Sequence, residues 1–240
     1  MTERDYEGDE LELFKNARNW KAYLYGFLEP HLAGARVLEV GAGLGGNVPF
    51  YKPYIDHLTF LEPDPELLAL AKKDHGNLVN VFIQGTTESM SSAEIGDGFD
   101  AILYSDVLEH IEDSVGEIRR ASAMLKPGGR LIIVVPAYPT LFSEFDAAIG
   151  HFRRYTRKML RREFEEGFPA GEVRVLRHLE ALGVVPSMAN KLLLRQSAPT
   201  AQQVAFWDGW IVPISRYILD PLVMGLAGKS VIGVIQKPEA

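Results

Sequence analysis

The chain has 240 residues, of which 47% are hydrophobic and 24% charged, and it contains no cysteine. These values are typical of a globular α/β protein with one large core, and the missing cysteine excludes disulfide frameworks, cysteine zinc sites and thiol nucleophiles. The formal net charge of −7 disfavours nucleic-acid binding, which usually needs a basic surface. The acidic N-terminus lacks an apolar signal core and no long uncharged apolar run occurs, so we expect a cytoplasmic protein without stable membrane insertion.

The first predicted element is a leading helix over residues 10–32, broken at Pro30. Apolar residues recur there at helical spacing. The helix either covers one face of a sheet or forms a lid over a ligand cleft, in which case Tyr23 or Trp20 could face the substrate.

A strand and a glycine-rich turn follow, and the rest of the chain is organised around them. Residues 36–40 form an apolar run typical of a buried parallel strand, and the glycines of residues 41–46 let backbone approach a ligand closely. Such a turn is a general nucleotide cradle and also fits the dinucleotide fingerprint. Glu39 distinguishes the alternatives, because a buried carboxylate needs a cationic or hydrogen-bonding partner. The ammonium group of S-adenosylmethionine would supply one, whereas NAD has none.

The second strand, residues 58–62, ends in an acidic side chain. Glu62 lies about 20 residues beyond the first glycine, where doubly wound folds place an acid that binds the ribose hydroxyls. It could instead cap the next helix, predicted over residues 66–74. Asp64 is the better candidate for the cap, because Pro65 suits the first helical position.

The following segments alternate between strands and helices. We predict a short helix over residues 48–54, strands over residues 79–84, 99–104 and 130–135, and a helix over residues 118–125. This alternation predicts a parallel sheet with helices on both faces. Ligands of such sheets bind at the carboxyl ends of the strands, where all of these motifs fall.

Four segments resemble, in order, the motifs of class I S-adenosylmethionine-dependent methyltransferases: Val-Leu-Glu-Val-Gly-Ala-Gly-Leu-Gly, Leu-Glu-Pro-Asp, Phe-Asp-Ala-Ile-Leu-Tyr-Ser-Asp-Val-Leu-Glu-His-Ile and Leu-Lys-Pro-Gly-Gly-Arg-Leu. The resemblance implies a Rossmann-like, doubly wound, seven-stranded sheet with an antiparallel last strand. Residues 172–177 and 230–236 would supply strands six and seven. The Gly-His-x-Arg-Arg-Tyr-Thr segment at residues 150–156 is similar to a signature of small-molecule methyltransferases.

The resemblance also implies a division of one domain, residues 1–240, into functional parts. Residues 10–32 would form the leading helix or lid and residues 36–136 the cofactor-binding core. Residues 137–228 would form the substrate loop, strand six and an apolar cap, and residues 229–240 the last strand.

By position in these motifs, the resemblance implies contacts to S-adenosylmethionine and its product S-adenosylhomocysteine. Glu62 would bind the ribose hydroxyls, and Thr86, Thr87 or a backbone group would replace the acidic residue that often binds adenine. The complete set of expected cofactor contacts is Glu39, Gly41, Ala42, Gly43, Asn47, Glu62, Pro63, Gly85, Thr86, Thr87, Asp106, Val107 and His110.

The candidate catalytic residues are His151, His110 and Tyr155. A sulfonium is already a strong electrophile, so the protein mainly aligns the acceptor and, for a hydroxyl, supplies a base. His110 is more readily explained as a wall of the cofactor pocket. His151 is either the base or an anchor of its loop against Asp146, and Tyr155 is the weaker candidate. The spacing of histidines and acids indicates no metal site.

Acceptor contacts are expected from the lid, the loop after strand five and the apolar insertion. Arg153 and Arg154 are hypothesised to contact an anionic substrate or to hold acidic residues of the lid. The helix that follows is predicted to begin at Thr156. The full set of candidate acceptor contacts is Tyr23, Tyr138, His151, Arg153, Arg154 and Trp207.

Residues 183–228 are strongly apolar and interrupted by prolines. We interpret this insertion as a cap over the acceptor pocket with a possible homodimer contact; a membrane-surface patch is the other explanation. The sequence therefore predicts methyl transfer to an O, N or C atom of a small organic acceptor, with anionic and secondary-metabolite-like acceptors included. The alternatives are a non-catalytic S-adenosylmethionine-binding partner subunit and an NAD-linked oxidoreductase, the latter disfavoured by Glu39 and the downstream motifs.

Overall fold

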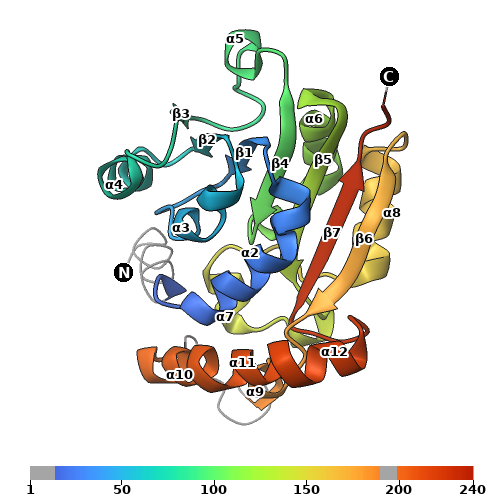
Figure 1. The fold of residues 1–240 in the computed structure, drawn as a ribbon. Helices are drawn as coiled ribbons and strands as arrows, with labels where there is room; N and C mark the ends of the chain where they lie inside the picture. Colours follow the sequence, from blue (N-terminus) through green and yellow to red (C-terminus); the bar gives the residue numbers. More distant parts are fainter. Residues whose placement is uncertain (1–13, 190–198, 240) are drawn as a thin grey trace.

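The computed structural model describes residues 14–189 and 199–239. A seven-stranded sheet with the order β3-β2-β1-β4-β5-β7-β6 forms its centre (Figure 1). Strands β1 to β5 run parallel, whereas β7 is antiparallel to both of its neighbours, β5 and β6. The predicted Rossmann-like sheet with an antiparallel last strand is therefore confirmed. The strands are β1 (Arg36–Val40), β2 (His57–Glu62), β3 (Val81–Gln84), β4 (Phe99–Ser105), β5 (Leu125–Pro136), β6 (Glu172–Leu179) and β7 (Ser230–Gln236).

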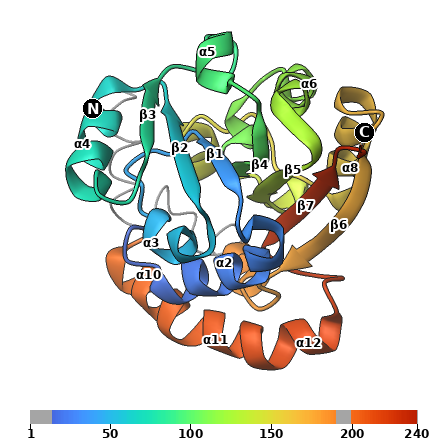
Figure 2. The same ribbon diagram turned by 45° about the horizontal axis from the view of Figure 1, so that its top comes forward.

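Helices cover both faces of the sheet (Figure 2), because the side chains of each buried strand alternate between two apolar clusters. Val40 packs in the cluster that contains Phe164 of α8, and Val37 packs in the opposite cluster with Leu24 of α2. The helices of the core are α2 (Arg18–Leu32), α3 (Val48–Tyr51), α4 (Pro65–His75), α5 (Ser92–Ile95), α6 (Ser114–Met124), α7 (Glu144–Ala148) and α8 (Arg157–Gly167).

The leading helix differs from its prediction at both ends. It begins at Arg18, and residues 10–13 lie outside the described residues. The carboxylate of Asp208, far along the chain, accepts the N–H groups of Asn19 (3.0 Å) and Trp20 (2.8 Å) and so caps this end. Pro30 does not break the helix, which continues to Leu32. A proline so close to the end removes one hydrogen bond and leaves the preceding turns intact.

Two helix starts follow the predicted capping chemistry. The side chain of Asp64 accepts the N–H groups of Glu66 and Leu67, with Pro65 in the first turn of α4. The hydroxyl of Thr156 accepts the N–H of Met159 at 3.1 Å, so α8 begins where expected. Two other predictions are wrong in their bounds. The helix predicted over residues 118–125 is α6, which starts earlier, after its cap Asp113. The strand predicted over residues 130–135 is β5, which already begins at Leu125 because that residue pairs with Phe99 of β4.

The apolar insertion lies between β6 and β7 and forms a helical rod across the carboxyl ends of the parallel strands (Figure 1). The rod consists of α10 (Ala201–Phe206), a π-helical turn (Trp207–Ile211), α11 (Val212–Ile214), a second π-helical turn (Ser215–Leu219) and α12 (Asp220–Val223), and it is preceded by α9 (Val184–Ala189). Within the described part of the chain, no helix combines the length and apolarity that crossing a membrane requires.

Candidate active site

A cavity of about 1000 Å³ lies at the carboxyl ends of the central strands. Its walls come from the glycine turn, the ends of β2 and β4, the inner side of α2, the loop after β5, and α10 with the π-helical turn after it. The predicted site residues that line it are Gly41, Ala42, Gly43, Asn47, Glu62, Pro63, Asp106, Val107, His110, His151, Arg154 and Trp207. Because most of the expected cofactor contacts are among them, the sequence motifs do converge on one space.

The glycine turn is tight because Gly41 has a positive φ of 64° and touches the loop after β4. Its N–H donates to the carbonyl oxygen of Leu61 at 2.9 Å, so the turn is tied to β2. A Cβ at Gly41 would lie 2.7 Å from Cγ2 of Val107. No side chain fits between the turn and Val107, and the backbone is left bare toward the cavity.

Replacing Gly41 by alanine is expected to weaken binding of S-adenosylhomocysteine by roughly 10-fold, because the positive φ and the contact with Val107 together force the turn to move. Titration calorimetry of the folded variant measures this. Gly26→Ala is the matched control, since a Cβ there meets nothing within 4 Å. Unchanged affinity of Gly41→Ala would show that the turn does not contact the cofactor.

Glu62 is buried and holds the turn while it faces the cavity. Its Oε2 accepts the N–H of Gly43 at 2.8 Å, and its Oε1 accepts the N–H of Asp64 at 3.0 Å. Carboxylate oxygens accept hydrogen bonds, and because this side chain lines the cavity, hydroxyl groups of a ligand would find an acceptor here. The geometry suits the ribose-binding role that the motif implies.

Glu39 does not line the cavity but lies behind it. The hydroxyl of Tyr51 donates to Glu39 Oε2, and Asn47, which does line the cavity, also bonds this carboxylate. Burial raises the pKa of Glu39 to about 7, although Tyr51, Asn47 and Lys21 act in the opposite direction. Glu39 is thus linked to the cavity wall through Asn47, and its expected contact with the methionyl group stays a prediction.

The raised pKa of Glu39 predicts a pH dependence of stability. Its ordinary pKa is 4.5 and its pKa in the fold about 7, so the native state binds more protons between these values than the unfolded chain. The contribution is fully present below pH 4.5 and is lost as the pH rises toward 7, by on the order of 1–3 kcal/mol. The free energy of unfolding, measured with urea at several pH values in this range, should fall less steeply with rising pH for Glu39→Gln than for the wild type. The exposed Glu66→Gln should keep the wild-type pH dependence.

Lys21 is a cavity residue that the sequence analysis missed. Its side chain is nearly buried, and its ammonium group donates to the carbonyl oxygens of Gly46 and Lys15, both at 3.1 Å. Burial lowers the pKa of Lys21, and Glu39 and Asp208 act against this shift. It brings a cation to the glycine turn, where a ligand carboxylate would be stabilised. Only its place on the amphipathic leading helix, facing the turn, could have indicated it.

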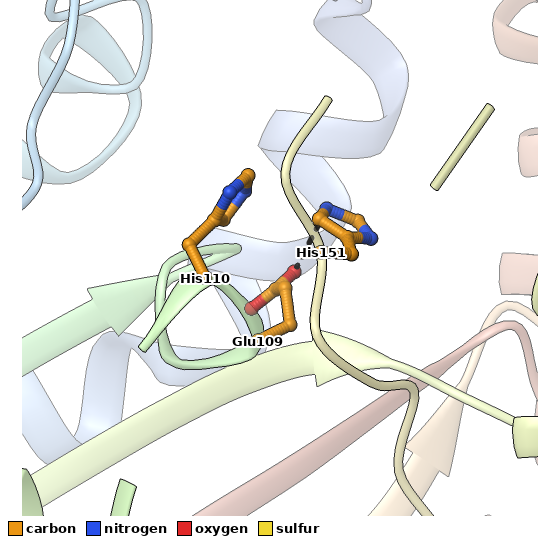
Figure 3. Close-up of side chains that lie close together, drawn as sticks. All are labelled: Glu109, His110 and His151. Carbon is orange, nitrogen blue, oxygen red and sulfur yellow. Dashed lines mark ion pairs between the residues drawn. The ribbon is translucent and has the colours of Figure 1, made fainter. Parts of the chain in front are cut away.

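Figure 3 shows three side chains that lie close together, Glu109, His110 and His151, and all three line the cavity. The imidazole rings of His110 and His151 are perpendicular, with centroids 4.5 Å apart. Oε1 of Glu109 lies 3.8 Å from Nε2 of His151. Burial, with a smaller contribution from His151, lowers the pKa of His110 to about 4, so its ring is neutral at neutral pH.

His151 is oriented by Asp146, which is completely buried. Nδ1 of His151 lies 3.0 Å from Oδ1 of Asp146, and Nε of Arg154 donates to the same oxygen at 2.7 Å. The backbone N–H and the hydroxyl of Ser143 donate to Oδ2. These hydrogen bonds and the Arg154 charge outweigh burial and hold the pKa of Asp146 well below its usual range. Because Asp146 is ionised and only accepts, Nδ1 of His151 carries the proton and Nε2 is left as the basic nitrogen.

The same three side chains are possible ligands for a cation. Glu109, His110 and His151 each offer one ligand atom, and these atoms lie within 4.8 Å of one another. Two imidazoles and one carboxylate suit divalent transition metals. The spacing in the sequence did not indicate this group, because His151 reaches it only through the fold of the loop after β5.

Asp106 faces the cavity from the end of β4 in a backbone conformation that is uncommon outside glycine, with φ at 55°. Its N–H donates to the carbonyl oxygen of Val134 at 2.9 Å, which fixes the turn. The side chain of Asp106 is exposed toward the cavity, and desolvation by the surrounding walls raises its pKa, while Lys229 and His151 act to lower it. Lys229 also lines the cavity, and its ammonium lies 3.8 Å from the centroid of a Trp207 ring.

The expected adenine contacts are not brought to the cavity. Gly85, Thr86 and Thr87 are absent from its lining. Thr87 donates its hydroxyl to the carboxylate of Glu117 at 2.8 Å, so this loop is tied to α6. Their role in cofactor binding stays a prediction.

Four of the other candidates also lie outside the cavity lining. Tyr23 donates its hydroxyl to Asp220 at 2.6 Å. The guanidinium of Arg153 donates to Ser114 Oγ and to the carbonyl oxygen of Glu112. Tyr138 stacks on His178. Tyr155 is completely buried in the core, where burial raises its pKa. Their side chains connect elements of the fold, so the acceptor and base roles expected for them are not supported by this geometry.

Comparison with known proteins agrees with this geometry. A family model described as a methyltransferase domain matches residues 13–168. A ubiquinone biosynthesis O-methyltransferase from Xanthomonas oryzae pv. oryzae is 36% identical over 104 residues, which are 42% of this chain and 43% of that protein. The match therefore spans less than half the length of this curated relative.

Two solved structures show how widely the fold is shared. N-methyltransferase NodS from Bradyrhizobium japonicum WM9, solved with S-adenosyl-L-homocysteine, has a TM-score of 0.55 and 15% identity over 92% of this chain and 86% of that one. The [4+2]-cyclase SpnF has a TM-score of 0.59 and 19% identity over 91% and 82%. At these identities the likeness shows the fold alone. The family match and the fold together show that the chain belongs to the methyltransferase-domain family, as a class I S-adenosylmethionine-dependent methyltransferase.

Proposed function

We propose that this methyltransferase transfers its methyl group to a hydroxyl oxygen of a small organic acceptor. The observation that carries the proposal is the buried Asp146–His151 pair, which presents Nε2 of His151 beside the cavity wall formed by Glu109 and His110. A hydroxyl must lose its proton as the methyl group arrives, whereas an amine needs less help. A base held in one tautomer by a buried carboxylate suits the first case.

The residues of the cavity fit S-adenosylmethionine. The bare glycine turn lets backbone approach the cofactor closely. The carboxylate of Glu62 suits the ribose hydroxyls of the cofactor, and the ammonium of Lys21 suits its carboxylate. When bound, the cofactor supplies an electrophilic methyl group on a sulfonium. The protein then has to hold the acceptor oxygen in line with the S–CH₃ bond, and such positioning can contribute several kcal/mol.

The proton follows a short route in this site. Nε2 of His151 takes the proton from the acceptor hydroxyl, while Nδ1–H remains hydrogen-bonded to Oδ1 of Asp146. The resulting imidazolium lies 3.0 Å from the ionised Asp146, which stabilises its charge, and 3.8 Å from Oε1 of Glu109. His110 adds no opposing charge, because its lowered pKa keeps it neutral.

Three further observations support this choice over its alternatives. Curated relatives from Xanthomonas and Xylella that match this chain carry the name ubiquinone biosynthesis O-methyltransferase. The cavity of about 1000 Å³ has room for an acceptor beside the cofactor, whereas a non-catalytic binding subunit would be recognised by the lack of an acceptor cavity. The match to a methyltransferase domain does not favour an NAD-linked oxidoreductase.

The test uses matched acceptors. The protein is incubated with methyl-labelled S-adenosylmethionine and a panel of small phenols, each paired with the aromatic amine of the same shape, and the products are identified by mass spectrometry. We expect methyl ethers from the phenols. Methylation confined to the amines or to ring carbon would overturn the proposal, and so would calorimetry that detects NAD binding but no binding of S-adenosylmethionine or S-adenosylhomocysteine.

A further inference from the structure

The helical rod over residues 201–223 exposes a row of large apolar side chains. Along the rod they follow one another mostly at intervals of four residues, and the two π-helical turns widen the helix beyond 3.6 residues per turn, so that this interval stays on one face. Their exposed fractions range from 38% for Ile214 to 71% for Leu222. The row consists of Phe206, Trp210, Ile214, Tyr217, Ile218 and Leu222, and Met224 and Leu226 extend it; together we call these residues the outer face.

The outer face cannot turn inward, because the opposite side of the rod is fixed by buried polar contacts. Asp208 caps the start of α2, and Asp220 accepts the N–H groups of Glu180 (2.7 Å) and Ala181 (2.8 Å). Ser215 is completely buried, and its hydroxyl accepts the N–H of Leu182 at 2.8 Å. The rod is thus attached along its length with its apolar row directed away from the protein.

The charges of the insertion favour an anionic partner. Both acids of the rod, Asp208 and Asp220, are buried in the contacts just described. Arg216 is the basic residue of the rod, and its guanidinium lies 5.1 Å from the centroid of the Tyr217 ring, at the side of the outer face. Of the three charged residues of the rod, only Arg216 lies outside these buried contacts, so the charge that the rod presents beside the outer face is positive, although the whole chain has a net charge of −7.

We propose that the outer face docks on the surface of an anionic lipid bilayer. An exposed apolar row with tryptophan and tyrosine and an arginine beside it has the composition of helices that lie in the membrane interface, where aromatic rings occupy the headgroup level. Basic residues add attraction to anionic lipids. The rod is an interfacial element and not a spanning one.

The outer face continues into the mouth of the cavity. Phe206 belongs to both, since it is 60% exposed and also lines the cavity together with Gln202 and Gln203 of α10. Docking would place this mouth at the lipid surface, so that an acceptor with an apolar part could pass from the bilayer to the site. The docking itself does not depend on the identity of the acceptor or on the proposed O-methylation.

Flotation of the full chain with lipid vesicles tests the proposal. We expect it to float with vesicles of phosphatidylcholine and phosphatidylglycerol, and much less with phosphatidylcholine alone. The combined variant Trp210→Gln, Ile218→Gln and Leu222→Gln should reduce the bound fraction by about 10-fold or more, because three of the apolar anchors are lost. Arg216→Gln should weaken the preference for the anionic lipid.

The matched control is Leu70→Gln with Val81→Gln, which removes exposed apolar side chains from α4 and β3 and should float like the wild type. Calorimetry with S-adenosylhomocysteine shows whether each variant is folded, so that failure of docking is separated from failure of methyl transfer. Two results would overturn the proposal: wild-type protein that does not float, or a triple variant that floats as well as the control. A wild-type dimer in light scattering that the triple variant abolishes, without flotation, would assign the outer face to a second copy instead.

Discussion

The His151→Gln variant is expected to lose activity by about 10²–10⁴-fold in kcat, the usual contribution of a general base. Glutamine keeps a polar side chain on Asp146 but offers no basic nitrogen at the position of Nε2. The KM for the acceptor and the affinity for S-adenosylhomocysteine should change little, because the glycine turn is untouched. Steady-state kinetics and calorimetry measure the two effects separately.

The matched control for this variant is His31→Gln, a histidine near the end of α2 that does not line the cavity. It should keep the wild-type kcat. Asp146→Asn should resemble His151→Gln in kcat, since the wrong tautomer of His151 would be stabilised. If His151→Gln retained full turnover, His151 would be only an anchor of its loop, and the proton would leave by another route.

Replacing Glu62 by glutamine is expected to weaken binding of S-adenosylmethionine and S-adenosylhomocysteine by roughly 10- to 100-fold, because hydrogen bonds to a charged group contribute about 1.5–3 kcal/mol. The amide keeps one acceptor for the N–H of Gly43 or Asp64 but places a donor where a ribose hydroxyl would donate. Titration calorimetry gives the affinity directly.

The control is Glu66→Gln, an exposed acid in the first turn of α4 only a few residues away. It should bind both ligands as the wild type does. Thermal unfolding followed by circular dichroism shows whether the Glu62→Gln variant is folded. Folded Glu62→Gln with wild-type affinity would remove Glu62 from the cofactor site and leave it with the structural role of holding the glycine turn.

Much of the fold could be predicted because its signals are local. The run of residues 36–40 is apolar on both sides, which only a strand covered on both faces tolerates, and β1 is indeed central in the sheet. Asp64 and Thr156 cap helices where their side chains can reach backbone within three residues. The part of the cavity around the glycine turn and Glu62 was predictable for the same reason, since both lie at the ends of strands.

The acceptor side was less predictable because its contacts join segments that are distant in sequence. Tyr23 was expected at the substrate, but Asp220 of α12 accepts its hydroxyl. Arg153 and Arg154 are adjacent and carry the same side chain. Arg153 donates to the start of α6 and to the loop before it, whereas Arg154 donates to Asp146 at the cavity. Lys21 belongs to no motif, and Glu109 lies within one of the methyltransferase-like segments without an expected role of its own. Their roles depend on which buried groups surround them.

By itself, the sequence determined the alternation of strands and helices, the bare turn at Gly41 and the acid at Glu62, because each depends on residues a few positions apart. Only the tertiary structure decided that Asp208 begins the leading helix, that Asp146 orients His151 toward Glu109, and that the apolar insertion exposes one of its faces. The physical reason is the cost of burying charge: a buried carboxylate must find donors wherever the folded chain supplies them. Those donors come from other elements, and no local pattern records them.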